Sequence, residues 1–232
     1  MFHLLPLGHA PFGGKELTTV GGCHDVSLIM DFLGSYLFPH GERVIDEWIA
    51  TGISLGGNLT WRLLQLGTSV GVYHLRHREN PPNPFCFLVL GLRRAERPIR
   101  VTPLTAEPRI STAIPIIGLP WPSFPKYLRA RALNMGLKWE PPLYPPSLKP
   151  VLETPRPEGA FAGKKILTIH GGEDTLVPFS QGEDDIEAIK REVEGSGGEM
   201  EVWIKDGVGH VVTADMVERV GEWVWRHALA AA

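Results

Sequence analysis

The sequence is poor in cysteine, in net charge and in long apolar runs. Its 232 residues include two cysteines, Cys23 and Cys86, without CxxC spacing, which argues against a disulfide framework and a zinc knuckle. The net charge is −3 and no stripe of Lys or Arg occurs, so we expect no nucleic-acid partner. No stretch approaches the roughly 18 apolar residues that cross a bilayer, and no basic leader precedes the first apolar run. We therefore expect a soluble, cytoplasmic protein without a membrane partner.

What is present is enough for one globular domain over residues 1–232. A chain of this length with 43% hydrophobic and 21% charged residues can bury one substantial core. Buried-strand patterns and helical periodicity alternate along it, which is typical of an α/β fold with a mostly parallel sheet flanked by helices. The predicted strands are 48–53, 110–117, 165–169 and 200–204, and the predicted helices between and after them are 59–66, 181–193 and 214–228.

Two helix starts carry further signals. From Asp25, apolar residues recur at the spacing of an amphipathic helix that Pro39 and Gly41 would end. The apolar positions of this helix are Val26, Ile29, Met30, Leu33 and Leu37. Ser180, with Glu183 three residues later, forms a candidate capping box for the helix at 181–193.

Two segments do not fit the alternation. Residues 68–103 combine an apolar burst at 85–90 with basic, proline-dotted surroundings, and we interpret them as an atypical insertion. The insertion is either a genuine surface segment or a gene-model artefact such as an unspliced intron. Residues 118–158 are rich in proline and predict a cap or lid with a short helix at 126–135. The tryptophans of this cap, Trp121 and Trp139, either line an acyl pocket or pack within the cap.

A serine framed by glycines follows the first predicted strand. Residues 51–57 read Thr-Gly-Ile-Ser-Leu-Gly-Gly, which places Gly52 and Gly56 two positions from Ser54 on either side. Strand, G-x-S-x-G turn and helix in this order are typical of a nucleophile elbow, where side chains at the glycine positions would clash with backbone. We predict that Ser54 is a nucleophile and that the N–H of Leu55 faces an oxyanion. A structural turn is the alternative.

A serine nucleophile needs an imidazole that takes its proton and a carboxylate that orients the imidazole. Asp174 lies on the loop after one predicted strand, and His210 lies in a glycine-flanked loop after the next. We predict Asp174 as the acid and His210 as the base, with Glu173 as the alternative acid. His170 is interpreted as a structural histidine at a strand end.

The other polar candidates carry no recognisable site. We expect Asp206 to be solvated. His74 and His77 have i, i+3 spacing, but nothing around them completes a set of metal ligands. We therefore predict neither a metal nor a cofactor.

The motifs TGISLGG, ILTIHGGEDTLVP and DGVGH together resemble the α/β-hydrolase family, in particular its prolyl-oligopeptidase-like and esterase-like branch and fungal members of it. The resemblance covers about residues 24–67 and 107–228, and the chain order Ser, Asp, His is that of the family. It implies that Ser54, Asp174 and His210 form a catalytic triad. Such a triad would cleave a small-molecule ester or a peptide-like substrate through an acyl-enzyme intermediate.

The chain departs from this family before the elbow. Family members have several strands there, whereas here one helix and a short strand at 2–7 fit, so we expect an N-terminally truncated sheet. The strand at 48–53 would then form an exposed apolar edge that allows self-association.

The same departure bears on catalysis. The loop that carries the second oxyanion donor in the family has no clear counterpart, although Pro6–His9 is a candidate. Loss of one donor typically costs on the order of 10² to 10³ in rate. The alternative function is therefore a catalytically impaired or truncated α/β-hydrolase-like protein that acts as a binding module or has no activity.

Overall fold

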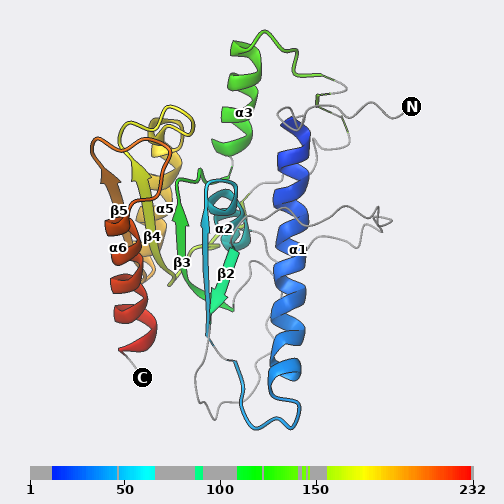
Figure 1. Ribbon diagram of the computed structural model, residues 1–232, viewed down its shortest axis with the longest axis vertical. Helices are drawn as coiled ribbons and strands as arrows, with labels where there is room; N and C mark the ends of the chain where they lie inside the picture. The colour runs from blue at the N-terminus through cyan, green and yellow to red at the C-terminus, as the bar shows by residue number, and fades with distance from the viewer. Residues whose placement is uncertain are drawn as a thin grey trace.

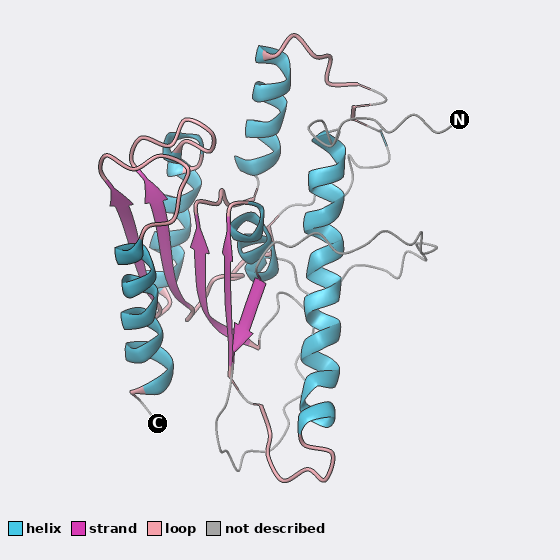
Figure 2. Cartoon of the chain, in the orientation of Figure 1, coloured by secondary structure: helices cyan, strands magenta, loops and turns pink. Residues whose placement is uncertain are grey.

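A single sheet organises the protein. The computed structural model describes residues 12–45, 47–65, 87–90, 109–121, 123–140, 143, 144, 146 and 156–230. The described residues form a five-stranded sheet in the order β2-β1-β3-β4-β5. In Figure 2 the arrows of four strands point one way and the arrow of β2 points the other way, as the parallel and antiparallel pairings require. The strands are β1 Trp48–Ile53, β2 Phe87–Leu90, β3 Ile110–Ile116, β4 Lys165–Gly171 and β5 Glu199–Lys205.

Helices cover both faces of the sheet (Figure 1). One hydrophobic cluster joins the strands to α1, α2 and α5, and a second cluster joins them to α3 and α6. Neighbouring residues of a strand enter different clusters: Ile166 packs in the first and Leu167 in the second. This alternation follows from the two-residue period of a strand, and it explains why β3 and β4 carry buried residues on both faces. The helical segments are α1 Phe12–Leu37, α2 Leu55–Gln65, α3 Ser123–Asn134, α5 Glu183–Gly195 and α6 Ala214–Val224, with the short 3₁₀ turn η2 Phe179–Gln181 and the π-helical turn η3 Trp225–Leu229.

The sequence predicts this architecture correctly in outline. The α/β fold with a mostly parallel sheet is confirmed, and the four predicted strands lie within two residues of β1, β3, β4 and β5. The predicted helix at 214–228 begins at Ala214 as expected, but it becomes a π-helix at Trp225. No described helix is long and apolar enough to cross a membrane.

Three local predictions are wrong. Helix α1 begins at Phe12 rather than near Asp25, and Ile29 and Leu37 of the predicted apolar stripe are 51% and 48% exposed. The buried stripe is narrower because α1 packs mainly on α2. Ser180 does not cap α5: it lies in η2, the N-cap is Gly182, and no side chain caps that end. The 3₁₀ turn shifts the helix start to Glu183, where the carboxylate cannot reach back as a capping box requires.

The third correction concerns the edge of the sheet. The sequence predicts β1 as an exposed edge, but β2 pairs antiparallel with it over Ile49–Gly52. β2 is formed by residues 87–90 of the predicted insertion. Residues 87–90 of the apolar burst are therefore part of the sheet, and in the described structure the outer edge on this side is β2.

Candidate active site

The serine turn lies at the carboxyl end of β1. Ser54 has a φ of 56°, and among the described residues Ile117 is the one other non-glycine residue with a positive φ. Ser54 N–H donates to the carbonyl oxygen of Ile116 at 2.9 Å, which ties the turn to the end of β3. Helix α2 begins at the next residue, so a strained backbone position holds the serine between a strand and a helix. The strand–turn–helix order is the one that the sequence predicts.

The glycines around Ser54 let backbones approach closely. A Cβ atom on Gly52 would lie 2.4 Å from the carbonyl oxygen of Gly56, a distance that no side chain tolerates. Gly57 is equally restricted, because a Cβ there would lie 2.6 Å from the carbonyl oxygen of Ile116. On the facing segment, a Cβ on Gly118 would lie 2.5 Å from the carbonyl carbon of Gly57. The first turn of α2 thus packs directly on the chain that leaves β3.

Two side chains of α2 fix this contact through polar groups, and neither role was predicted from the sequence. Asn58 is buried, and its Oδ1 accepts a hydrogen bond from Leu119 N–H at 2.7 Å. The indole N–H of Trp61 donates to the carbonyl oxygen of Gly118 at 3.1 Å. The doubled glycine at 56–57 was visible in the sequence, but its partner at 118 lies 61 residues beyond Gly57, and only the fold brings them together.

The structure brings Ser54, His210 and Asp174 into one chain of contacts. Ser54 Oγ lies 3.0 Å from His210 Nε2, and His210 Nδ1 lies 2.7 Å from Asp174 Oδ2. A carboxylate oxygen only accepts, so Nδ1 carries the proton and Nε2 is left to accept the serine hydroxyl. The three residues follow β1, β4 and β5, whose carboxyl ends meet at one edge of the sheet.

Burial differs along this chain of contacts. The Asp174 side chain is 1% exposed, and that of His210 is 23% exposed. Asp174 Oδ1 accepts the backbone N–H groups of Leu176 and Val177, each at 2.8 Å. The carboxylate is therefore fixed on both oxygens, while the imidazole stays partly exposed.

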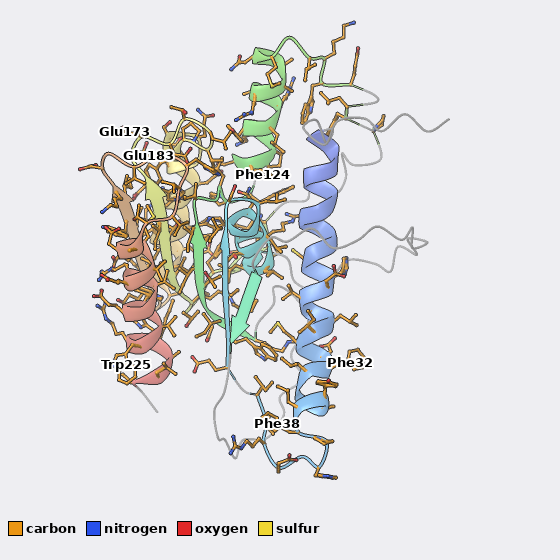
Figure 3. All side chains as sticks on the ribbon, in the orientation of Figure 1. Phe32, Phe38, Phe124, Glu173, Glu183 and Trp225 are labelled. Carbon is orange, nitrogen blue, oxygen red and sulfur yellow. The ribbon has the colours of Figure 1, made fainter. Side chains whose placement is uncertain are left out.

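The alternative residues lie elsewhere. Glu173 is exposed on the loop above β4 (Figure 3), and its backbone N–H donates to Val208. Asp206 is exposed, as its solvated interpretation requires. His170 is buried; its Nε2 lies 3.0 Å from Thr168 Oγ1, and its Nδ1 has no hydrogen-bond partner among the described atoms. Burial lowers the pKa of His170 to about 4, and the nearby Asp174 opposes this shift.

The loop that carries His210 also packs closely on a glycine. A Cβ on Gly171, the last residue of β4, would lie 2.4 Å from the carbonyl oxygens of both Val208 and Gly209. The loop that carries His210 can therefore lie across the end of β4 and reach Asp174. This requirement was not recognised in the sequence, where Gly171 is one of two adjacent glycines.

One candidate oxyanion donor lies within the described residues. Leu55 is the first residue of α2, so its N–H has no carbonyl partner within the helix. The partial positive charge of a helix N-terminus favours a negative charge there. The second predicted source, Pro6–His9, lies outside the described residues, as do His74 and His77.

The predicted cap is described in part. Its helix α3 begins three residues earlier than expected, and Phe124 near its start packs close to the sheet (Figure 3). Trp121 is 2% exposed, with the Arg62 guanidinium 4.2 Å from its ring centroid, so it belongs to the core. The Trp139 ring stacks on Tyr144 with centroids 4.8 Å apart. Neither contact assigns an acyl pocket to these rings.

These features define a class of protein. A mostly parallel sheet flanked by helices, with a strained serine after one strand and an aspartate and a histidine on the loops after two others, is an α/β-hydrolase-like fold. No protein-family model matches the sequence, and no curated protein matches it.

Several solved structures are similar to the chain. SOBER1 from Arabidopsis thaliana shares 15% identity with a TM-score of 0.45, over 91% of this chain and 65% of that one. An esterase from Pyrococcus furiosus shares 17% identity with a TM-score of 0.47, over 94% of this chain and 64% of the esterase. Acyl-protein thioesterase 2 from Zea mays shares 13% identity with a TM-score of 0.41, over 97% of this chain and 69% of the thioesterase. The protein thus spans about two thirds of the length of these structures.

Proposed function

We propose that the protein is a serine hydrolase that cleaves an ester bond, or an amide or peptide bond, by acylation of Ser54. The supporting observation is the pair of contacts that joins Ser54 Oγ to His210 at 3.0 Å and His210 to Asp174 at 2.7 Å. Both distances are those of hydrogen bonds that transfer or orient a proton. The positive φ of Ser54 adds to this support, because strain at such a turn exposes a nucleophile.

The proposed reaction uses the three residues in turn. Ser54 Oγ attacks the carbonyl carbon of the substrate while His210 Nε2 takes the hydroxyl proton, and Asp174 stabilises the imidazolium that forms. The alcohol or amine leaves with that proton, which gives an acyl-enzyme. Water then attacks the acyl group with His210 again as the base, and the proton returns to Ser54 as the acid product leaves. The Leu55 N–H would stabilise the oxyanion in both steps.

The finer assignments are part of the same proposal. The motifs around Ser54, Asp174 and His210 favour the prolyl-oligopeptidase-like and esterase-like branch, and short-chain esters are the first substrates to test. The reaction needs no cofactor. We place it in the cytoplasm, in keeping with the low cysteine content.

A fluorophosphonate probe tests the proposal. It phosphonylates a serine only when a neighbouring base activates that serine, so we expect labelling of the wild-type protein at Ser54, located by peptide mass spectrometry. Ser54→Ala should abolish labelling, and His210→Gln should slow it on the order of 10³-fold or more. Wild-type protein that shows a folded circular-dichroism spectrum but takes up no probe contradicts the proposal.

The alternative is an α/β-hydrolase-like protein that binds a partner without turning it over. The observation that favours it is the single candidate oxyanion donor, Leu55, among the described residues. Under this alternative Ser54 stays unlabelled, or it is labelled but no ester is hydrolysed above the rate of the Ser54→Ala variant. Measurement of both labelling and turnover on the same preparation separates the two functions.

A further inference from the structure

Helix α3 contacts the loop that carries Asp174. Tyr127 and Arg131 lie four residues apart and so share one face of α3. The Tyr127 hydroxyl donates to the carbonyl oxygen of Leu176. Arg131 Nη1 donates to the same carbonyl oxygen at 3.1 Å and to the Tyr127 hydroxyl oxygen at 2.7 Å. The Leu176 carbonyl oxygen therefore accepts hydrogen bonds from the Tyr127 phenol and from the Arg131 guanidinium. The guanidinium also donates to the phenol oxygen.

This carbonyl belongs to the peptide group that holds the carboxylate. The Leu176 carbonyl and the Val177 N–H are the two ends of one peptide group, and Val177 N lies 2.8 Å from Asp174 Oδ1. A charged donor on the carbonyl polarises the peptide, so its N–H becomes a stronger donor to the carboxylate. It also prevents this peptide from rotating away from Asp174.

We propose that Tyr127 and Arg131 are positioning residues for the acid of the active site. They fix the peptide between Leu176 and Val177, this peptide holds Asp174 Oδ1, and the other carboxylate oxygen is thereby directed at the imidazole of the base. The inference rests on the proposed function and gives the described helix of the cap a role in it. A hydrogen-bonded chain thus runs from a cation on α3 to the candidate triad.

The attachment of α3 makes this role physically reasonable. Leu128 and Ala132 of α3 are 2% and 0% exposed, so the helix is anchored by its apolar face independently of the two polar residues. The Ser123 hydroxyl near its start donates to Asp185 of α5. Because the helix keeps these anchors, removal of the Tyr127 hydroxyl or the Arg131 guanidinium should change the loop that carries Asp174 rather than unfold α3.

The test uses Tyr127→Phe, Arg131→Met and the double variant of the full chain. We expect each single variant to lower the rate constant of Ser54 labelling by a fluorophosphonate about tenfold, the effect of one hydrogen bond on a transition state. The double variant should lose little more than either single one, because both residues act through the same carbonyl oxygen. With a short-chain ester, kcat should fall while KM stays unchanged, and Arg131→Lys should recover part of the loss.

Matched controls remove the same groups elsewhere. Arg129→Met takes a guanidinium from an exposed position of α3, and Tyr36→Phe takes a phenol hydroxyl from an exposed position of α1. Both should label at the wild-type rate. Labelling of Tyr127→Phe and Arg131→Met at that same rate overturns the proposal and leaves α3 with a purely structural contact.

A second readout does not depend on activity. Hydrogen exchange of the Val177 amide should be about tenfold faster in Tyr127→Phe and Arg131→Met than in the wild type and in the controls. If wild-type protein takes up no probe but Val177 exchange responds as expected, the proposed function fails while the hold of α3 on this peptide stands. If Val177 exchange is unchanged in both variants, the positioning role is overturned whatever the activity.

Discussion

At the scale of single residues, the serine turn depends on backbones that leave no room for a side chain. A Cβ on Gly52 would lie 2.4 Å from the Gly56 carbonyl oxygen, and neither backbone segment can move without displacing Ser54. We expect Gly52→Ala to lower the free energy of unfolding by about 1–3 kcal/mol, as measured by urea titration. Gly34→Ala in α1 is the matched control: nothing lies within 4 Å of its Cβ position, so it should be neutral or stabilising by about 0.5–1 kcal/mol. Equal effects of the two substitutions would count against the steric argument.

Buried His170 makes the stability depend on pH. Burial lowers the pKa of its imidazole from 6.5 to about 4, so between these values the unfolded chain binds a proton that the folded chain does not. His170 therefore does not lower the free energy of unfolding above about pH 6.5. It lowers this free energy progressively as the pH falls towards 4. Between pH 7 and pH 5 we expect the free energy of unfolding to fall by about 2 kcal/mol more in the wild type than in His170→Gln. Urea titrations at the two pH values measure this, and parallel losses in both proteins would refute it.

At the scale of elements, β2 decides whether β1 is covered. Successive amides of an antiparallel edge strand point alternately at the neighbouring strand and away from it. Of the two substitutions Leu88→Pro and Val89→Pro, one must remove a donor to β1 and the other a donor on the outer side. We expect the substitution that removes a donor to β1 to lower the free energy of unfolding by about 2 kcal/mol. The substitution that removes an outward donor should lower it much less. Urea titration of both variants measures the two effects. If neither substitution changes the free energy of unfolding, the pairing of β2 with β1 does not stabilise the protein in solution.

At the scale of the whole molecule, the described sheet ends at β2 and β5, each of which pairs with one described neighbour. Self-association stays a prediction, and the exposed edge on which it would depend is the outer edge of β2 rather than β1. We expect the weight-average sedimentation coefficient of the wild type to rise with concentration. Whichever proline substitution in β2 leaves the stability unchanged should reduce this rise, because it removes an outward donor from the edge. Association that is insensitive to that substitution would contradict pairing at β2.

Much of the fold and of the candidate site could be predicted because the signals are local. Trp48–Ile53 consists of apolar and strand-compatible residues and leads into a G-x-S-x-G turn, so strand, turn and helix follow from neighbouring residues. Asp174 and His210 each follow a short predicted strand, which places them at the same edge of a parallel sheet as Ser54. The catalytic roles of the three residues stay predictions, for which the labelling experiment is the test.

The three wrong predictions have different physical causes. The pairing of β2 with β1 joins residues 87–90 to 49–52, and no local pattern records such a register. The capping box failed because one 3₁₀ turn moved the start of α5 by two residues. Ile29 and Leu37 of α1 are exposed because packing, not periodicity, decides which apolar positions of a helix are covered.

By itself, the sequence determined the alternation of strands and helices, the glycine-framed serine, and the positions of an aspartate and a histidine after later strands. These features depend on hydrophobic period and turn chemistry, which act over a few residues. The tertiary structure alone decided the close approach of Gly57 to Gly118, the pairing of β2 with β1, and the contact of Tyr127 and Arg131 with the loop that carries Asp174. Each of these joins segments that are tens of residues apart, and only the packed sheet and its helices bring them within reach.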